Sequence, residues 1–359
     1  MPAAKSHQAF VPSNKPMVSI IIPHWNGIDV LSECLESLQK THYSDYEVIV
    51  VDNASSDKSA EWIKENHSNI VLVQNEINYG YAGGCNRGAD IATGDYIVFL
   101  NNDTIQDQHW LTPLVNRMES DNTIAAIQPK VLNYFQRNLF DYAGGAGGHM
   151  DIFCFPFTKG RLFLFQEIDR GQYNTAKPCF WASGTAIMVR KDKFEKAGGF
   201  DEIFFSHMEE IDLCWRFHAM GFQVWSEPKS IVFHKNAVSM PMYSHQKYYL
   251  NHRNSQLMLF GNYSLPLTLY LGFVRFMLEW IAFGYALFKL DWNHLTGILR
   301  AFGWLIFHPH RIWQKRKHFK QLRQVKDKDI IRNMAKFAVV VEYYIKRRKT
   351  YSDIESRAA

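Results

Sequence analysis

Cysteine is scarce in this sequence, and its few copies are scattered. None of the five belongs to a CxxC pair, the spacing of zinc and redox motifs, and their odd number does not suit a disulfide framework. A disulfide-stabilised secreted protein and a zinc-finger protein are therefore excluded, and a reducing cytosol is favoured. Residues 1–16 also lack the apolar segment of a signal peptide, so we expect an N-terminal tail on a cytoplasmic protein. The cysteines are Cys34, Cys85, Cys154, Cys179 and Cys214.

A long uninterrupted apolar run is also missing. The nearest approach is residues 265–290, which are rich in Leu, Phe, Tyr and Trp but contain Arg275, Glu279 and Lys289. A membrane-spanning helix needs about 20 mostly apolar residues, so this stretch is not a convincing span. Arg275 and Glu279 are four residues apart, and we expect them to pair on one face of a helix.

Positive charge is concentrated near the end of the chain. The formal net charge is +5, and residues 311–349 carry most of the excess. Aromatic residues beside Lys and Arg suit a helix that lies in a membrane interface. We therefore expect residues 247–359 to form a helical region in peripheral contact with the inner face of the cytoplasmic membrane, and we expect no nucleic acid partner. A helical cap packed on the rest of the chain, or a dimer contact, would leave the same pattern.

Two common nucleotide-binding signatures are absent. No GxGxxG directly follows the first predicted strand, and no GxxxxGK[ST] occurs. What is present is an alternation of strands and helices over residues 17–130, which indicates βαβ units and a parallel sheet. We expect strands at 18–23, 47–52, 70–74, 96–100 and 124–128, helices at 31–40, 58–66 and 110–119, and a glycine-rich loop at 78–88 before a further helical stretch.

The alternation stops after residue 130. Residues 131–173 contain a glycine cluster followed by aromatics, and we expect a flexible, irregular segment over the active site. Farther on, we expect a strand at 181–190, a helix at 208–220 that opens with acids, and two short strands at 222–226 and 231–234.

The most informative stretch is Tyr96–Thr104, YIVFLNNDT. An apolar run reads as a buried central strand, and Asn101, Asn102 and Asp103 follow at its carboxyl end. In open α/β sheets this edge is where ligands bind. Asp103 is therefore a candidate metal ligand, since hard divalent cations prefer oxygen ligands.

Several motifs occur in a fixed order around this stretch, and together they resemble glycosyltransferase family 2. They are VSIIIPHWNG (18–27), VIVVDNASSD (48–57), NEINYGYAGGCNRG (75–88), GDYIVFLNNDT (94–104), WASGTAIMVR (181–190) and GGFDEIFFSHMEEIDLCWR (198–216), with a strand that ends at His234. The chain looks closest to bacterial rhamnosyltransferase-like members.

The resemblance implies an inverting enzyme with the α/β GT-A fold, a mostly parallel central sheet flanked by helices, here with a C-terminal helical extension. The catalytic domain would cover residues 17–246. Its nucleotide-sugar-binding half would be 17–130, and its acceptor and catalytic half would be 131–246.

The same resemblance implies which residues bind the nucleotide sugar. Asp52 would contact the base or ribose, glycines of the 78–88 segment would let backbone N–H groups approach the diphosphate, and Arg87 would hold its charge. Alternatively, these glycines serve helix packing and Arg87 is solvated. Trp181 would stack on a sugar face or belong to the core. The full implied set is Pro23, Asp52, Asn78, Gly80, Gly84, Asn86, Arg87, Asn101, Asn102 and Trp181.

The resemblance also implies a metal site and a catalytic base. Asp103 and His234 would bind Mn²⁺ or Mg²⁺, which would neutralise the diphosphate. Glu209, Glu210 and Asp212 match the acidic motif of the family, with Glu210 as the expected base and Glu209 as the alternative. Asp212 could instead pair with Arg216 one helix turn away, and the whole cluster could be an acidic helix N-terminus.

The implied function is transfer of a sugar, L-rhamnose being one candidate, from a dTDP- or UDP-sugar to a glycan or lipid-linked oligosaccharide in bacterial surface polysaccharide synthesis. A nucleotidyltransferase that makes the nucleotide sugar is a second reading, although Pro23–Gly27 stands where its glycine-rich loop would follow the first strand. A non-catalytic scaffold with a relic site is a third.

Overall fold

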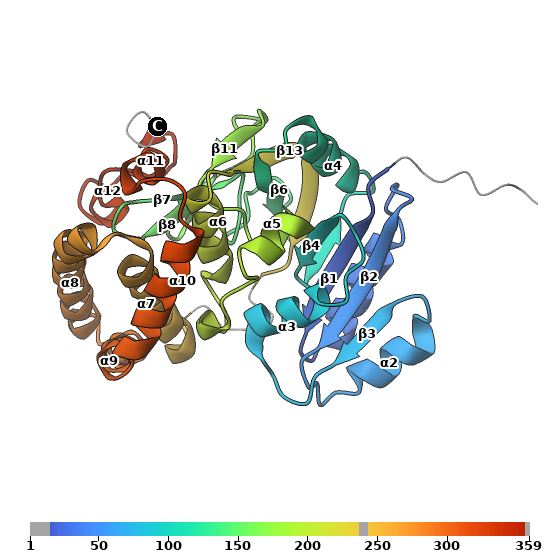
Figure 1. Ribbon diagram of the computed structural model, residues 1–359, viewed down its shortest axis with the longest axis horizontal. Helices are drawn as coiled ribbons and strands as arrows, with labels where there is room; N and C mark the ends of the chain where they lie inside the picture. Colours follow the sequence, from blue (N-terminus) through green and yellow to red (C-terminus); the bar gives the residue numbers. More distant parts are fainter. Residues whose placement is uncertain (1–14, 237–242, 356–359) are drawn as a thin grey trace, which may run out of the picture.

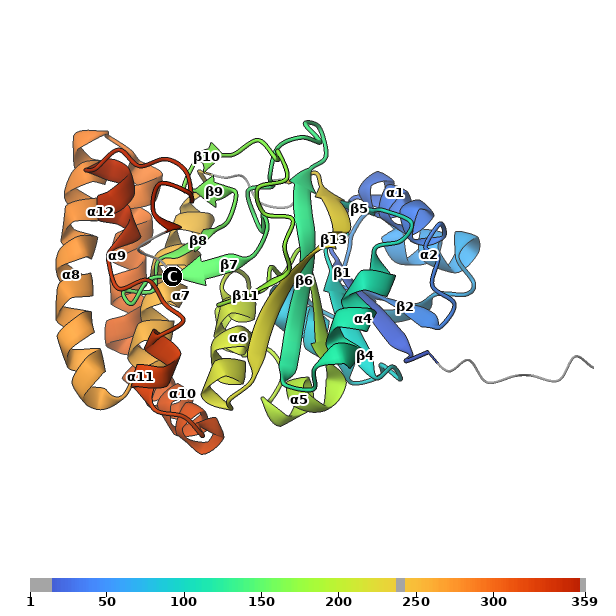
Figure 2. The ribbon, with the colours of Figure 1, turned by 90° about the horizontal axis from the view of Figure 1, so that it is seen from above.

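The computed structural model describes residues 15–236 and 243–355, so nearly all of the predicted N-terminal tail lies outside the described residues. A twisted sheet covered by helices occupies one end of the molecule, and a group of C-terminal helices occupies the other (Figures 1 and 2). A small second sheet lies between the main sheet and these helices.

The main sheet has nine strands in the order β11-β13-β6-β12-β4-β1-β2-β3, and β5 pairs with β13. Neighbours from β4 to β3 are parallel, as are β6 and β13, whereas β12 runs antiparallel to both β4 and β6. The sheet is thus mixed and mostly parallel. Its strands are β1 Val18–His24, β2 Tyr46–Asp52, β3 Val71–Gln74, β4 Tyr96–Leu100, β5 Thr104–Gln106, β6 Ile124–Asn133, β11 Lys177–Cys179, β12 Ala186–Arg190 and β13 Gln223–His234.

Helices cover both faces of this sheet, which explains why its central strands are apolar without alternation. In β4, Tyr96, Val98 and Leu100 belong to one hydrophobic cluster with α1 and α4, whereas Ile97 and Phe99 belong to another with α3 and α6. The helices of this part of the chain are α1 Ile28–Leu38, α2 Ser59–Asn66, α3 Gly80–Ala89, α4 Leu111–Ser120, α5 Lys191–Lys196 and α6 Glu209–Ala219.

The predicted glycine-rich loop at 78–88 is wrong, because most of it forms helix α3. Its glycines allow atoms of other elements to approach the backbone of α3 closely. A Cβ on Gly88 would lie 2.4 Å from Cγ2 of Ile21, and one on Gly80 would lie 2.3 Å from the Phe205 carbonyl oxygen. Gly80 also has a φ of +72°, which disfavours other residues. Tertiary packing therefore outweighs the low helix propensity of glycine here.

The prediction of an irregular segment at 131–173 is wrong in part, although most of its residues lie outside helices and strands. Strand β6 continues to Asn133, and four short strands then form an antiparallel sheet in the order β10-β9-β8-β7. This sheet shares a hydrophobic cluster with Val339 and Ile354 from the end of the chain. Its strands are β7 Gly148–Met150, β8 Pro156–Thr158, β9 Arg161–Leu162 and β10 Phe165–Gln166.

Two smaller predictions also differ from the structure. The strand expected at 181–190 begins only at Ala186, and the two strands expected at 222–226 and 231–234 are one long strand, β13. The register of β13 against β6 shifts between Glu227 and Ile231, so an irregularity in the strand produced the apparent break.

In the part of the chain that the structure describes, six helices follow β13. The first, α7, places Leu257, Met258 and Leu259 in the same hydrophobic cluster as Trp215 of α6. Helix α8 is the one described helix that is long and apolar enough to cross a membrane, by length and composition only. The predicted pair between Arg275 and Glu279 is confirmed, with Nε to Oε1 at 2.9 Å. The helices are α7 His245–Asn262, α8 Leu265–Phe288, α9 Trp292–Phe307, α10 Pro309–Leu322, α11 Asp327–Ile331 and α12 Val339–Tyr344.

Candidate active site

Asp103 and His234 lie together at the carboxyl end of β4. Asp103 directly precedes β5, and β5 pairs with the end of β13 so that Thr104 faces His234. This pairing places Nε2 of His234 3.1 Å from Oδ1 of Asp103. The other ring nitrogen, Nδ1, lies 3.0 Å from Oδ1 of Asp141. All three side chains are buried.

The charges of these three residues are interdependent. Burial disfavours the charged form of His234, but Asp103 and Asp141 outweigh this effect and raise its pKa to about 10. Burial would likewise raise the pKa of Asp103, yet the adjacent imidazolium lowers it below the ordinary value. The two side chains therefore form an ion pair in the absence of a metal.

The same residues fit a divalent cation. Oδ1 of Asp103 is buried and has no hydrogen bond in spite of its contact with His234, so it is available as a ligand. A carboxylate behind the second ring nitrogen, here Asp141, is the usual support of a metal-binding histidine. The described residues contain no group of three or more His, Cys, Asp or Glu side chains that could hold a metal, so water and substrate oxygens would complete the shell.

Glu209 and Glu210 begin helix α6. Glu209 is buried and Glu210 is half-buried, and Oε2 of each is buried without a hydrogen bond. Burial, and then the charge of Glu210, raise the pKa of Glu209 well above its ordinary value. Burial raises the pKa of Glu210 to about 7 against the opposing effect of backbone N–H groups, among them that of Gly184. A carboxylate with a pKa near neutrality is suited to accept a proton.

These acids lie beside the end of β4. The Thr185 carbonyl accepts a hydrogen bond of 3.0 Å from the backbone N–H of Asn101, and the neighbouring residue Gly184 contacts Glu210. The segment before β12 thus connects the acids with the polar end of the central strand. The structure brings the predicted base and the predicted metal ligands to the same edge of the sheet.

The loop before α6 has an unusual backbone that is held by α7. Phe205, His207 and Met208 all have positive φ, between 63° and 73°, which is costly for residues other than glycine. The buried side-chain amide of Asn254 donates to the carbonyls of Phe204, Ser206 and His207 at 2.6–3.2 Å. Arg253 donates to the same loop at the carbonyls of Ile203 and Phe204. No motif in the sequence pointed to these two residues.

Asp212 has different surroundings from Glu209 and Glu210. It is fully buried, its Oδ2 accepts from Nε of Arg216 at 3.0 Å, and its Oδ1 lies 2.7 Å from Nζ of Lys315 in α10. Asn262 donates to the same carboxylate. Burial opposes its charge, but Lys315 and Arg216 lower its pKa. This geometry favours a role in holding α6, as the alternative pairing with Arg216 implied, over a catalytic one.

Several predicted nucleotide-binding residues do meet at the sheet edge. Strands β1 and β2 are in register, with His24 beside Asp52 and Pro23 beside Val51. Asp52 is buried and accepts from the backbone N–H of Ser55. The side-chain amide of Asn102 lies 2.9 Å from Nδ1 of His24. Pro23, Asp52, Asn101 and Asn102 thus end adjacent strands, as expected.

The residues at 78–88, which were predicted to form a loop, mostly contact other residues of the protein. Asn78 accepts from the N–H of Gly80, and a Cβ on Gly84 would lie 2.7 Å from Nδ2 of Asn53. The Asn86 side chain both donates to and accepts from the backbone of Phe200. The close approach at Gly80 and Gly84 agrees with the alternative interpretation, in which the glycines serve helix packing, and Asn86 joins α3 to the backbone of Phe200.

Arg87 and Trp181 also have internal partners. Arg87 pairs with Glu202 at 3.3 Å and stacks on Tyr79, so it is neither free in solvent nor aimed at an open site. Trp181 is buried in the core, donates to the His149 carbonyl at 2.7 Å and packs on Gly148. The core interpretation of Trp181 is the one that the structure supports.

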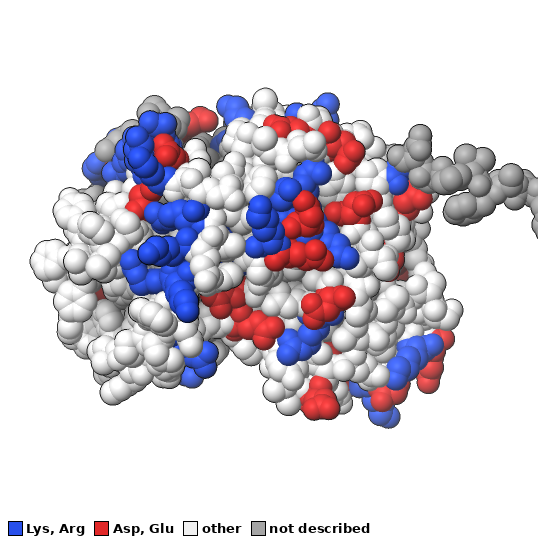
Figure 3. Space-filling view, viewed as in Figure 1, with Lys and Arg blue, Asp and Glu red and all other residues white. Residues whose placement is uncertain are grey.

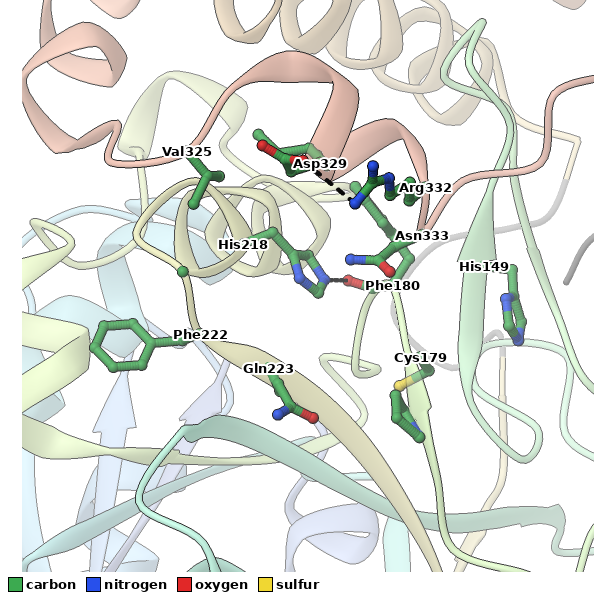
Figure 4. A pocket seen from close by; sticks show the side chains of 13 residues that line it. His149, Cys179, Phe180, His218, Phe222, Gln223, Val325, Asp329, Arg332 and Asn333 are labelled. Carbon is green, nitrogen blue, oxygen red and sulfur yellow. Dashed lines mark hydrogen bonds and ion pairs between the residues drawn. The ribbon is translucent and has the colours of Figure 1, made fainter.

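A cavity of about 450 Å³ lies elsewhere in the molecule (Figure 4). It is lined by residues that include Phe180, His218, Gln223 and Arg332, and the Nε2 atom of His218 lies 2.8 Å from the Phe180 carbonyl. None of the predicted catalytic or metal-binding residues lines it. It is therefore not the site described above.

Comparison with solved structures places the fold. The chain resembles a structure of GalNAc-T7 with UDP, GalNAc and Mn²⁺ (TM-score 0.54, 19% identity, 68% of this chain and 48% of the other covered). It also resembles the mannosyltransferase PcManGT from Pyrobaculum calidifontis with GDP-Man and Mn²⁺ (TM-score 0.51, 16% identity, 90% and 88% covered). The fold is that of the GT-A class, as expected.

Sequence comparison then identifies the family. Residues 19–198, half of the chain, match the family model of glycosyl transferase family 2, and the chain belongs to this family. It is 30% identical over 214 residues to the amylovoran biosynthesis glycosyltransferase AmsB of Erwinia amylovora, covering 57% of this chain and 65% of the relative. It is 27% identical to the O-antigen biosynthesis protein RfbC of Myxococcus xanthus, covering 62% and 18%. The chain thus spans less than two thirds of the length of either relative.

Proposed function

We propose that this protein is an inverting glycosyltransferase that moves a sugar from a nucleoside diphosphate to an acceptor hydroxyl. The observation that carries the proposal is the Glu210 carboxyl, whose Oε2 is buried without a hydrogen bond and whose pKa is raised to about 7, at the same sheet edge as Asp103 and His234. A nucleotidyltransferase has less support, because β1 is followed by Trp25, Asn26 and Gly27 and then by helix α1, and not by a glycine-rich loop.

In the proposed reaction Glu210 accepts the proton of the acceptor hydroxyl while the oxygen of that hydroxyl forms a bond to the anomeric carbon. The bond from that carbon to the diphosphate oxygen breaks, and its electron pair leaves with the nucleoside diphosphate. Glu209, kept neutral by burial and by the charge of Glu210, leaves its neighbour as the single base of the pair. Asn254 and Arg253 keep the loop of these acids in position.

We propose Mn²⁺ or Mg²⁺ as the cofactor, with Asp103 and His234 as its protein ligands. When bound, the cation would neutralise charge that develops on the leaving diphosphate. Two solved structures of the same fold contain Mn²⁺, which supports this choice. His234 must lose its proton to bind a metal, and Asp141 would then orient the neutral ring.

The substrates are proposed at a coarser level. The donor is a nucleotide sugar, with dTDP- or UDP-sugars and L-rhamnose as first candidates. The acceptor is a glycan or a lipid-linked oligosaccharide of a surface polysaccharide, at the cytoplasmic face of the membrane. Relatives named for amylovoran and O-antigen biosynthesis support this class of pathway.

Nucleotide-sugar binding and turnover test the proposal. We expect one nucleotide family to raise the melting temperature in a Mn²⁺-dependent way, and a sugar nucleotide of that family to be consumed slowly by hydrolysis and faster with an acceptor. Glu210→Gln should bind this nucleotide sugar but not transfer the sugar. A folded protein that binds no nucleotide with Mn²⁺ or Mg²⁺ would overturn the proposal in favour of a scaffold, and a Glu210→Gln variant of full activity would overturn the role of Glu210 as the base.

A further inference from the structure

Helix α8 carries its charged residues inward and its apolar residues outward. Arg275 and Glu279 are its two charged residues, and both are buried. The opposite side has no charge, and Leu269, Phe273, Ile281 and Phe288 are exposed by 68%, 67%, 68% and 82%. A helix on the surface of a soluble protein has the reverse pattern. Exposure of this side of α8 to water is therefore unfavourable.

Neighbouring helices extend this surface. Helix α8 forms the outer edge of the molecule at the end opposite to β3, with α9 beside it (Figures 1 and 2). We call the exposed side of α8, together with the exposed apolar side chains of α9 and the start of α10, the apolar face. Continuous apolar surface of this kind marks a contact site. Besides the α8 residues, its members include Trp292, Leu299, Ile306, Phe307 and Trp313.

Positive charge borders the apolar face. Residues 265–349 contain 17 Lys and Arg but five Asp and Glu, a net charge of +12, so the rest of the chain carries −7. All five acids are buried or half-buried, and several bases are exposed. In Figure 3 the basic side chains gather next to a broad uncharged area at this end of the molecule. The exposed bases include Arg311, Lys317, Lys320, Lys346, Arg347 and Lys349.

We propose that the apolar face docks on an anionic phospholipid bilayer, with α8 lying in the plane of the interface. Aromatic and aliphatic side chains enter the boundary between headgroups and acyl chains, and the basic border contacts lipid phosphates. A second copy of the chain fits less well, because a symmetric contact would bring two borders of the same charge together. The inference deepens the proposed function, on which it rests for the purpose of the contact, access to a lipid-linked acceptor.

The buried polar contacts of α8 explain why it lies flat and does not span. Arg275 donates to the Phe153 carbonyl at 2.8 Å and to Oγ of Ser255 in α7 at 2.9 Å. Oε2 of Glu279 lies 2.6 Å from Nδ1 of His252, also in α7. If α8 crossed the bilayer, Arg275 and Glu279 would lose these partners and lie in hydrocarbon, which is costly for charged side chains.

Vesicle flotation of the full-length protein without nucleotide tests this proposal. We expect strong binding to vesicles of phosphatidylcholine with phosphatidylglycerol, weaker binding to phosphatidylcholine alone, and a decrease with added salt. Replacing two exposed side chains in Phe273→Gln/Ile281→Gln should lower vesicle affinity at least about tenfold. The matched control Val71→Gln/Ile91→Gln, which changes two exposed apolar residues at the other end of the molecule, should bind like the wild type.

Three results would overturn the proposal. The first is equal vesicle binding by both double variants and the wild type when their circular dichroism spectra agree. The second is a dimer in solution that Phe273→Gln/Ile281→Gln converts to a monomer, since a second copy would then cover the face. The third is resistance of the membrane-bound protein to alkaline carbonate, which would indicate a spanning helix. Because flotation uses no sugar nucleotide, its outcome is independent of whether transfer is observed.

Discussion

Glu209 and Glu210 are adjacent in sequence but meet different surroundings. The charges of both act on Tyr81 of α3, but only that of Glu209 acts on the enclosed thiol of Cys85, whose pKa is raised mainly by burial. Glu210 contacts the Gly184 backbone beside the end of β4. Two carboxyl groups with separated pKa values can hold different roles at one pH. The deeper one remains protonated, and the one near the sheet edge titrates near neutrality.

A pH dependence of transfer follows from Glu210. We predict that kcat/KM increases with pH and levels off above a midpoint near pH 7, because the base works only when ionised and burial raises the pKa of Glu210 to about 7. An ordinary glutamate would give a midpoint near pH 4. The check is a pH profile of transfer. Glu210→Gln should lower kcat roughly 10²–10⁴-fold, and the exposed control Glu195→Gln should not.

The same group affects stability in the opposite direction. A carboxyl whose pKa is raised by folding stabilises the folded state at acid pH and loses this contribution as pH increases from its unfolded pKa, near 4, to about 7. Glu210→Gln should therefore melt at a higher temperature than the wild type above pH 7, with the difference shrinking toward pH 4. Equal melting temperatures of Glu210→Gln and the wild type both above pH 7 and at pH 4 would contradict the raised pKa of Glu210.

Asp141 offers a separate test of the metal site. It contacts Nδ1 of His234, whereas Nε2 is the ring nitrogen that lies beside Asp103 and would bind the metal. We predict that Asp141→Asn lowers Mn²⁺ affinity about 10- to 100-fold in the presence of the nucleotide, because the ring of His234 loses its orienting carboxylate. Titration calorimetry measures the affinity directly. Asp107→Asn, at an exposed loop position, is the matched control and should bind Mn²⁺ like the wild type.

Among the elements, the strands of the first half follow closely from their sequence. Continuous apolar runs that end in Asp52 or Asn101 predicted both β2 and β4 and the edge at which the polar groups meet. Helix α3 could not be predicted as a helix because its stability comes from contacts of glycine with Asn53 and Ile21, which lie on other elements. Strands β7 to β10 have only two or three residues each, too few to show a period.

The contacts by which α7 supports the loop of the acids could likewise not be predicted from the sequence. Asn254 and Phe204 are 50 residues apart, and an amide in a helix has no spacing that signals a partner across the molecule. What the sequence did contain was an ordered set of motifs, which predicted the acids, Asp103 and His234 but not the residues that position them. Burial and hydrogen bonding, and not residue type, distinguish Asn254 from the half-buried Asn251 of the same helix.

A substitution in helix α7 tests this support of the loop before α6. Asn254→Ala removes three hydrogen bonds to a loop with strained backbone, and we expect the free energy of unfolding to fall by about 1–3 kcal/mol. We also expect kcat to fall more than nucleotide affinity, because the acids lose their position while the donor side is unchanged. Asn251→Ala, at a half-buried position of the same helix, is the control for both measurements. Equal effects on kcat and on nucleotide affinity would argue against a positioning role.

Across the whole molecule, Lys315 joins the C-terminal helices to α6, the helix that begins with Glu209 and Glu210. Its ammonium lies 2.7 Å from Oδ1 of Asp212 and 3.0 Å from Oδ2 of Asp201, and its side chain passes so close to Gly261 of α7 that a Cβ there would lie 2.7 Å from Cδ of Lys315. Three segments distant in sequence meet at this one side chain. The C-terminal region thus contributes to the structure of the site as well as to the apolar face.

We predict that Lys315→Met lowers the free energy of unfolding by about 3 kcal/mol, because it leaves the buried Asp212 with less compensating charge. Denaturant unfolding followed by circular dichroism measures the change, and we expect a single transition for both proteins. Lys317→Met, at an exposed position two residues later, should change the stability by less than about 0.5 kcal/mol. Equal stability of Lys315→Met and the wild type would show that Arg216 alone satisfies Asp212.

The uneven charge of the chain gives the molecule an electric dipole moment. With +12 in residues 265–349 and −7 in the remainder, an approaching negative surface exerts a torque on the protein before any contact forms. Screening limits this torque to about 8 Å at physiological ionic strength, so it acts in the last step of approach. Collisions would then begin with the C-terminal helices facing the surface, and the rate of productive encounters would exceed that of a randomly tumbling body.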